Sequence, residues 1–323
     1  DGTLSFIDEK TETVSNNVFE TTNERKLGST VQDGVILGNN LYIAVSKSNT
    51  IEVVNKNTLV SVVQIVPTPA QGNTPRDIVT DGKYVYVSMY TGVVSRIDPS
   101  TNTIDKTVAV GPNPEEMVIV NKSLYVTNSD GNNYNAGYAN GKSVSKISLS
   151  DFVEEKKIAV GLNPTKITAD ALGNVLVLCM GDYSATPATV WKINAEDEAT
   201  SMNIPATIMD IKDNSLYVIN APYGAPSITY TVYNTSSGAV EKENFVSAPV
   251  DAPAGIAVHS DGRIFITSYT LVGGFASYKT PGYVSEYSSD GTFVKKYDVG
   301  VGAVSMTFLK YCLLYTSDAA DDK

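Results

Sequence analysis

Three stretches of the chain share one pattern that decides the fold: GNTPRDIVTDGKYVYVSM (72–89), GPNPEEMVIVNKSLYVTN (111–128) and GLNPTKITADALGNVLVLC (161–179). Each begins with a Gly-x-x-Pro turn and continues as an alternating strand. A turn at Asp, Asn, Lys or Gly then leads into a second apolar strand. The pattern therefore predicts a repeated unit that opens with an antiparallel pair of strands.

Further copies of this unit occur along the chain, at 33–46, 204–220 and 252–268, and one more begins at 300–309. Equivalent positions of the second strand are 39 to 52 residues apart; they are Tyr42, Tyr86, Tyr125, Val177, Tyr217 and Phe265. This spacing is close to the ~40–50 residues of a four-stranded propeller blade. Two more strands with hairpin turn residues fit between the copies, and no segment has a sustained helical period. The pattern predicts an all-β repeat array.

The ends of the array predict how it closes. Six units are complete, residues 2–19 supply only the outer two strands of a unit, and 300–309 begin its inner half. Joining these ends gives a seven-bladed β-propeller whose last blade is closed by strands from both termini. We expect a single propeller over residues 1–311, truncated at its amino terminus so that the second strand of the closing blade lies upstream. The sequence CLLYTSDAADD resembles a translated sequencing adapter, so we interpret residues 312–323 as a non-native tail.

Composition excludes several classes of function. The chain has 24 Lys and Arg residues and 35 Asp and Glu residues, which gives a formal net charge of −11. So acidic a surface disfavours binding to nucleic acid or to anionic lipid, and no run approaches the ~18 apolar residues of a membrane span. Two cysteines and one histidine leave little for a disulfide framework, a metal cage or a catalytic triad. We expect no cofactor and no membrane insertion by this chain.

The repeats carry a family likeness. The Gly-x-Asn-Pro turns, Leu-Tyr-Val-Thr-Asn at 124–128 and Ser-Arg-Ile-Asp-Pro-Ser-Thr-Asn at 95–102 resemble YVTN, YncE-like seven-bladed propellers. The order of features, from Leu-Ser-Phe-Ile-Asp at the start to YDVGVGAVSMTF at the end, is similar to Bacteroidetes surface propeller lipoproteins, also labelled surface-layer proteins. The resemblance implies a cell-surface or periplasmic location. One branch of that group, the BtuG type, captures cobalamin and passes it to an outer-membrane transporter.

Long connections predict the binding face. Connections between second and third strands are unusually long at 127–142, 180–189, 220–227 and 268–282, and in a propeller they lie on one face. They are rich in tyrosine, which combines wide apolar contact with one hydroxyl and suits binding more than catalysis. The alternative is that these tyrosines only pack the loops on each other. The aromatic and acidic candidates on this face are Tyr90, Tyr134, Tyr138, Asp182, Tyr183, Tyr223, Tyr269 and Tyr278.

Charged residues just after the Gly-x-x-Pro turns are the polar candidates. Arg76, Glu115 and Lys166 enter the innermost strands and either fix a ligand at the channel mouth or form ion pairs between blades. Glu116 follows Glu115 directly, so we expect the two carboxylates to point to opposite faces rather than to form an acid–base pair. We interpret residues 128–133 as an Asn/Asp/Gly loop rather than a calcium site, and His259 as a surface turn on the opposite face.

The sequence thus predicts a non-catalytic extracytoplasmic binding propeller. Its ligand is a small molecule, with a corrinoid such as cobalamin implied by the resemblance, or a glycan, and a possible partner is an outer-membrane transporter. A protein-interaction scaffold in a surface complex is the alternative, and it predicts an exposed apolar patch instead of a cavity. A metal-dependent propeller lactonase or lyase is a third possibility, which requires an inward cluster of carboxylates around a metal.

Overall fold

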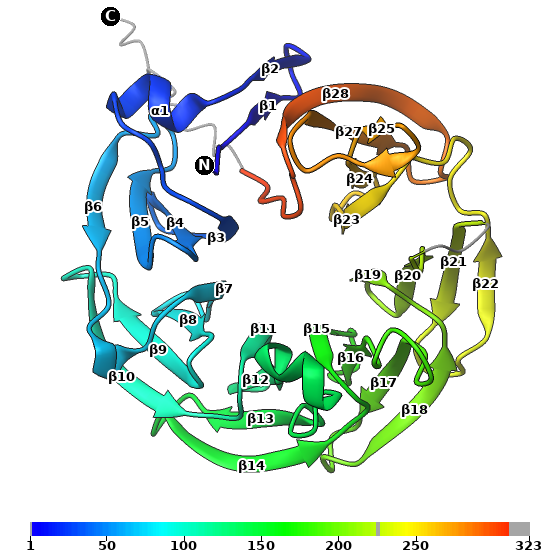
Figure 1. Cartoon of the computed structure of the whole chain (residues 1–323), viewed down its shortest axis with the longest axis horizontal. Helices are drawn as coiled ribbons and strands as arrows, with labels where there is room; N and C mark the ends of the chain where they lie inside the picture. Colours follow the sequence, from blue (N-terminus) through cyan, green and yellow to red (C-terminus); the bar gives the residue numbers. More distant parts are fainter. Residues whose placement is uncertain (1, 224–226, 310–323) are drawn as a thin grey trace, which may run out of the picture.

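The computed structural model describes residues 2–223 and 227–309 and places six four-stranded antiparallel sheets around a common centre (Figure 1). In each sheet the first strand lies next to the centre and the others follow outward. The first three sheets are β3 (Val31–Leu37), β4 (Asn40–Val45), β5 (Thr50–Asn55) and β6 (Ser61–Ile65); β7 (Pro75–Thr80), β8 (Val85–Met89), β9 (Val93–Asp98) and β10 (Thr103–Ala109); β11 (Pro114–Val120), β12 (Ser123–Asn128), β13 (Ser143–Ser148) and β14 (Val153–Ala159).

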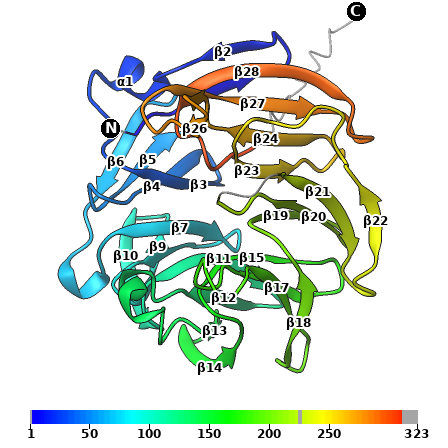
Figure 2. The same ribbon diagram turned by 45° about the vertical axis from the view of Figure 1, so that its right-hand side comes forward.

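The other three sheets repeat this order, seen from another angle in Figure 2. They are β15 (Pro164–Ala169), β16 (Val175–Cys179), β17 (Thr189–Ile193) and β18 (Ala199–Ile204); β19 (Ile208–Lys212), β20 (Ser215–Asn220), β21 (Thr229–Asn234) and β22 (Val240–Glu243); β23 (Pro253–Val258), β24 (Ile264–Ser268), β27 (Pro281–Tyr287) and β28 (Phe293–Val301). The predicted all-β propeller is confirmed, and every sheet begins where the repeat predicts a first strand.

A few short elements complete the described chain. They are the hairpins β1 (Phe6–Asp8) with β2 (Thr13–Ser15) and β25 (Leu271–Val272) with β26 (Phe275–Ala276), the helix α1 (Val18–Asn23), and the 3₁₀ turns η1 (Pro69–Gln71) and η2 (Gly131–Ala136). No helix in the described part of the chain is long and apolar enough to cross a membrane.

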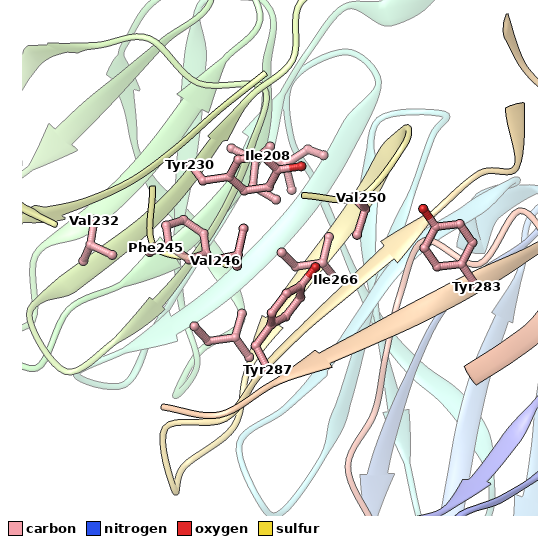
Figure 3. Packing of buried hydrophobic residues seen from close by; sticks show 11 residues of the cluster. Ile208, Tyr230, Val232, Phe245, Val246, Val250, Ile266, Tyr283 and Tyr287 are labelled. Carbon is pink, nitrogen blue, oxygen red and sulfur yellow. The ribbon is translucent and has the colours of Figure 1, made fainter. Parts of the chain in front are cut away.

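The hydrophobic core lies between neighbouring blades. Figure 3 shows one such interface, where Ile208, Tyr230 and Phe245 of the fifth blade pack against Ile266 and Tyr287 of the sixth. Because the sheets of the second to fifth blades are covered by a blade on both faces, their second strands are apolar at nearly every position, as in the fully buried β16. The strands therefore read as continuous apolar runs rather than as clean alternations.

The predicted count of seven four-stranded blades is wrong for the described residues, which contain six. The two ends of the described chain, residues 2–15 and 302–309, do meet between the first and sixth blades, as predicted, and we call this place the seventh position. Hairpin β1–β2 lies alongside β28, where Asn16 donates to the carbonyl of Asp298 and Gly300 N–H donates to Ser5 Oγ. Residues 302–309 enter nearer the centre but form no strand. A strand requires a hydrogen-bonded neighbour, and none of the described strands lies between 302–309 and β1. The predicted tail at 312–323 lies outside the described residues.

Candidate functional site

The six innermost strands bring equivalent residues to one place. Second and third residues of five of these strands line a cavity of about 530 Å³ at the centre of the ring, which we call the central cavity. The third residues are Asp33 in β3, Asp77 in β7, Glu116 in β11, Lys166 in β15 and Asp210 in β19. The corresponding second residues are Gln32, Arg76, Glu115, Thr165 and Met209. One repeat position therefore builds one ring of polar side chains.

Carboxylates of this ring join three pairs of neighbouring blades. Met117 N–H donates to Asp77 Oδ2 at 2.8 Å, Ile167 N–H donates to Glu116 Oε2 at 3.3 Å, and Val258 N–H donates to Asp210 Oδ2 at 2.7 Å. Each bond satisfies a backbone donor on the neighbouring innermost strand, where water is largely excluded. The acidic residues thus have a structural role in addition to forming the cavity wall.

Two ion pairs between blades also lie in the cavity wall. Arg76 donates through Nε and Nη2 to Glu115 Oε2 at 2.8 and 2.6 Å, and Lys166 Nζ donates to Glu116 Oε1 at 2.5 Å. The expected inter-blade ion pairing is therefore present, and all four side chains also line the cavity. Glu115 and Glu116 pair in opposite directions around the ring, but a bulge between Pro114 and Met117 lets both line the cavity.

Burial of so many carboxyl groups shifts their protonation. Removal from water raises the pKa of Asp33, and it raises that of Asp77 well above the usual range, with the negative charge of Asp33 adding to the shift. Burial likewise raises the pKa of Asp210 to about 6. Attraction to Glu116 raises the pKa of Lys166, which keeps it charged. The cavity therefore gains negative charge as the pH rises through the weakly acidic range.

Three of the predicted tyrosines gather at or beside the central cavity. Tyr183, from the long connection between β16 and β17, lines the cavity and packs against Tyr138 with ring centroids 6.3 Å apart. Tyr90 lies behind the wall, with the Arg76 guanidinium 4.8 Å from the centre of its ring. Burial, with Glu115 nearby, raises the pKa of Tyr90 to about 12. Tyr90 thus positions Arg76, and Tyr183 offers an aromatic surface to a ligand.

The remaining predicted residues do not line the central cavity. Tyr134 is exposed, Tyr223 is 96% exposed, and Tyr269 stacks edge-on against Tyr278 with centroids 4.9 Å apart. Asp182 accepts backbone N–H groups of Ser184 and Thr186, which fixes the turn that carries Tyr183. Tyr269 and Tyr278 contact each other, as expected under the alternative that these tyrosines only pack the loops on each other.

The Asn/Asp/Gly loop uses its oxygens for its own hydrogen bonds. Asp130 Oδ2 accepts from Asn133 Nδ2 and from the N–H of Asn140, and Ser129 Oγ donates to the carbonyl of Asn113. Over residues 2–223 and 227–309, no three His, Cys, Asp or Glu side chains are placed to share a metal ion.

His259 is not the exposed surface residue that we predicted. It does lie in a tight turn, because the Gly262 N–H donates to its carbonyl at 2.8 Å. Its side chain is only 20% exposed and packs edge-on against Phe308, with ring centroids 4.8 Å apart. Phe308 partly covers this side chain, and that contact is not visible in the local sequence.

Asp33, Asp77 and Asp210 were missed as site residues. A signal for them exists, since each is the third residue of an innermost strand, and an isoleucine or valine follows it within two positions. Met306, which joins the cavity wall from the seventh position, has no such signal because its segment forms no strand.

These features define a β-propeller with a polar cavity at its centre. The chain belongs to the family described as "Domain of unknown function (DUF5074)", whose model matches residues 1–299. A search of curated proteins returned no match.

Solved structures share the fold at low sequence identity. Hydrazine synthase of Kuenenia stuttgartiensis is 14% identical with a TM-score of 0.64, over 87% of this chain and 91% of that one. The computationally designed protein Ika8 is 9% identical with a TM-score of 0.59, over 87% and 91%. A functionally unknown protein from Desulfotomaculum acetoxidans DSM 771 is 13% identical with a TM-score of 0.59, over 82% and 81%. Likeness at this level of identity concerns the fold alone.

Proposed function

We propose that this protein is a non-catalytic binding propeller and that its ligand site is the central cavity. The observation that carries the proposal is convergence: residues from the six described blades and Tyr183 from a long loop surround one cavity of about 530 Å³. Concave sites with a few convergent polar groups and an aromatic wall are typical of small-molecule binding.

The wall favours a ligand that donates hydrogen bonds. Asp33, Asp77, Glu116 and Asp210 present acceptors, whereas the two cations of the wall, Arg76 and Lys166, already pair with carboxylates. A glycan, with many hydroxyl donors and apolar ring faces for Tyr183, fits this chemistry. A corrinoid, which carries amide donors and stacks on aromatic rings, is the candidate that the family resemblance supplies. The phosphate of a corrinoid such as cobalamin can pair with Arg76 only by competing with Glu115 for the guanidinium.

Calorimetric titration of the full chain with cobalamin, then with a panel of glycans, tests the proposal. Tyr183→Ala should weaken binding by at least about tenfold, as expected for an aromatic anchor. Tyr223→Ala is the matched control, because that ring is exposed and lies outside the cavity, and it should bind as the unchanged chain does. If cobalamin does not bind but a glycan does, the site stands and the corrinoid is removed. If both tyrosine changes have equal effects, the site lies elsewhere.

The cellular role follows from the resemblance rather than from the cavity. We propose an extracytoplasmic location, at the cell surface or in the periplasm, and delivery of the captured ligand to an outer-membrane transporter. Protease accessibility in intact cells tests the location. Co-purification with a transporter tests the partner, and ligand-independent co-purification would favour the scaffold role instead.

One observation favours a protein-interaction scaffold as the second candidate. Hairpin β25–β26 exposes Leu271, Val272 and Phe275, which are 41%, 58% and 70% exposed, on a connection much longer than a strand pair needs. Adjacent exposed apolar side chains are typical of contact surfaces. Replacing all three with serine should abolish such a contact in a pull-down and leave calorimetric ligand binding unchanged.

A further inference from the structure

The charges that line the central cavity do not balance. Its wall has five carboxyl side chains and two cationic ones. The two ion pairs between blades use both cations and two of the carboxylates. The three other carboxylates, Asp33, Asp77 and Asp210, have no cationic partner among the described residues. Because unpaired negative charge is costly away from water, the cavity favours a positively charged occupant.

Asp77 has an oxygen without a donor. This residue is only 8% exposed, and its Oδ2 accepts the N–H of Met117. Among the described residues, no amide, ammonium, guanidinium or hydroxyl group donates to its Oδ1. Burial, and then the negative charge of Asp33 on the neighbouring strand, raise the pKa of Asp77. Since buried polar atoms are normally satisfied, a donor that enters the cavity completes this site.

The three unpaired carboxylates lie on two sides of the cavity. Asp33 and Asp77 belong to the adjacent strands β3 and β7, and Asp210 belongs to β19 across the centre of the ring (Figure 1). The equivalent positions between Asp210 and Asp33 are Gly255 of β23 and Ser305, and neither carries a charge. The opposite path crosses β11 and β15, whose cavity charges form one of the ion pairs. The unpaired negative charge is therefore divided between two opposite places.

Apolar surface is part of the same wall. Met209, Ile256 and Met306 line the cavity together with Tyr183. The Tyr183 residue is 66% exposed, so its ring is free to contact a ligand. Methylene groups pack on such surfaces, and an ammonium group near a tyrosine ring is attracted to its face. A ligand with positive ends and an aliphatic middle is complementary to this wall.

We propose that the ligand of the central cavity is an aliphatic diamine or polyamine. One ammonium group binds between Asp33 and Asp77, a second binds Asp210, and the methylene chain contacts Tyr183. Ammonium groups supply both the N–H donors and the positive charge that these carboxylates lack, whereas a glycan supplies donors alone. This inference rests on the proposed function, because it names the ligand class of the same cavity.

Protonation of the carboxyl groups makes this binding depend on pH. Burial raises the pKa of Asp33, and it raises that of Asp210 to about 6. An ammonium group binds the ionised form, so its affinity should increase as the pH rises through about 6, with release of protons on binding below that range. The other charged groups of the wall face one another as ion pairs; they are Arg76, Glu115, Glu116 and Lys166.

Calorimetric titration of the full chain with putrescine tests the ligand class. Butylamine, with one ammonium group, and butanediol, with none, are controls of the same chain length. We expect putrescine to bind at least tenfold more tightly than butylamine, and butanediol not to bind. Putrescine affinity should increase at least tenfold between about pH 5 and about pH 7.5, with proton release detected by comparing buffers of different ionisation enthalpy. Equal affinity for putrescine and butylamine, or a putrescine affinity that does not change with pH, overturns the inference.

Charge-removing variants place the ligand. Asp77→Asn and Asp210→Asn each keep an acceptor oxygen and should each reduce putrescine affinity to about that of butylamine. Glu243→Gln, at an exposed position of β22 outside the cavity, is the matched control and should bind as the unchanged chain does. Should Asp77→Asn fail to fold, Asp210→Asn provides the test, because its amide oxygen can still accept the Val258 N–H. Equal effects of the cavity variants and the control overturn the assignment.

The same titrations separate this inference from the proposed function. If putrescine does not bind, but cobalamin or a glycan binds and is weakened by Tyr183→Ala, the diamine is wrong and the central cavity remains the ligand site. If putrescine, cobalamin and the glycans all fail to bind, both the diamine and the binding role of the cavity are wrong.

Discussion

The second blade and the seventh position are built from the same repeat but differ in structure. GNTPRDIVT (72–80) leads into strand β7, whereas GVGAVSMTF (300–308), which has the same pattern, forms no strand after Val301. β7 is hydrogen-bonded to β8, whereas residues 302–309 are separated from β1 by a cavity of about 780 Å³, which we call the seventh-position groove. The comparison teaches that the sequence pattern specifies which side chains face an adjacent strand. The segment becomes a strand only where that adjacent strand is present to form hydrogen bonds with it.

The largest expected effect compares two phenylalanines. Phe245, at the interface of the fifth and sixth blades, is 1% exposed, and Phe245→Ala should lower the free energy of unfolding by about 3–5 kcal/mol. Phe308→Ala, at the seventh position, should cost about 1–2 kcal/mol, because its surroundings can relax into the groove. Chemical denaturation measures both. Equal costs would show that the seventh position is packed as tightly as a complete blade.

A second pair of changes compares ion pairs between blades. Glu115→Gln leaves Arg76 in the cavity wall without its carboxylate and should cost about 2 kcal/mol, since the Glu115 side chain is only 12% exposed. Glu12→Gln removes the carboxylate paired with Lys295 at the seventh position, where the Glu12 side chain is 65% exposed, and should leave the melting temperature unchanged. Calorimetric melting checks both, and a loss of stability in Glu12→Gln would mean that the seventh position is held chiefly by charge.

These contrasts also explain what the sequence could predict. The strand positions follow from turn chemistry and apolar runs, as at Gly-x-Asn-Pro before β11 and β15, and these are local. Arg76 and Glu115 were predicted either to fix a ligand or to form ion pairs between blades. Their position directly after the turn is also a local feature of the sequence. The ring of Asp33, Asp77 and Asp210 depends on how blades are placed side by side, and the burial of His259 depends on Phe308, about 50 residues away. Contacts between blades have no local signature.

The pH dependence of stability provides a third comparison. The pKa of Asp210 is raised by burial to about 6, so the folded chain holds a proton there that the unfolded chain has released. Stability attributable to this group is therefore lost as the pH rises from about 4 to about 6. Asp210→Asn, which keeps an acceptor for Val258, should recover about 2 kcal/mol at pH 7 relative to pH 4. Ser305 occupies the equivalent place at the seventh position and donates to Asp33, so Ser305→Ala should raise the pKa of Asp33 further and steepen the loss of stability with rising pH.

The smallest expected effect concerns His259. Its ring contacts Phe308 edge-on and lines the seventh-position groove, so His259→Ala should cost about 0.5–1.5 kcal/mol, the range of an aromatic pair. Calorimetric binding at the central cavity should be unaffected, because His259 does not line it. The double change His259→Ala with Phe308→Ala separates two explanations. If the histidine acts through this contact, its cost disappears once Phe308 is absent. If the cost persists in that background, His259 instead stabilises its own turn, and residues 302–309 make a smaller contribution to closing the ring than the contact indicates.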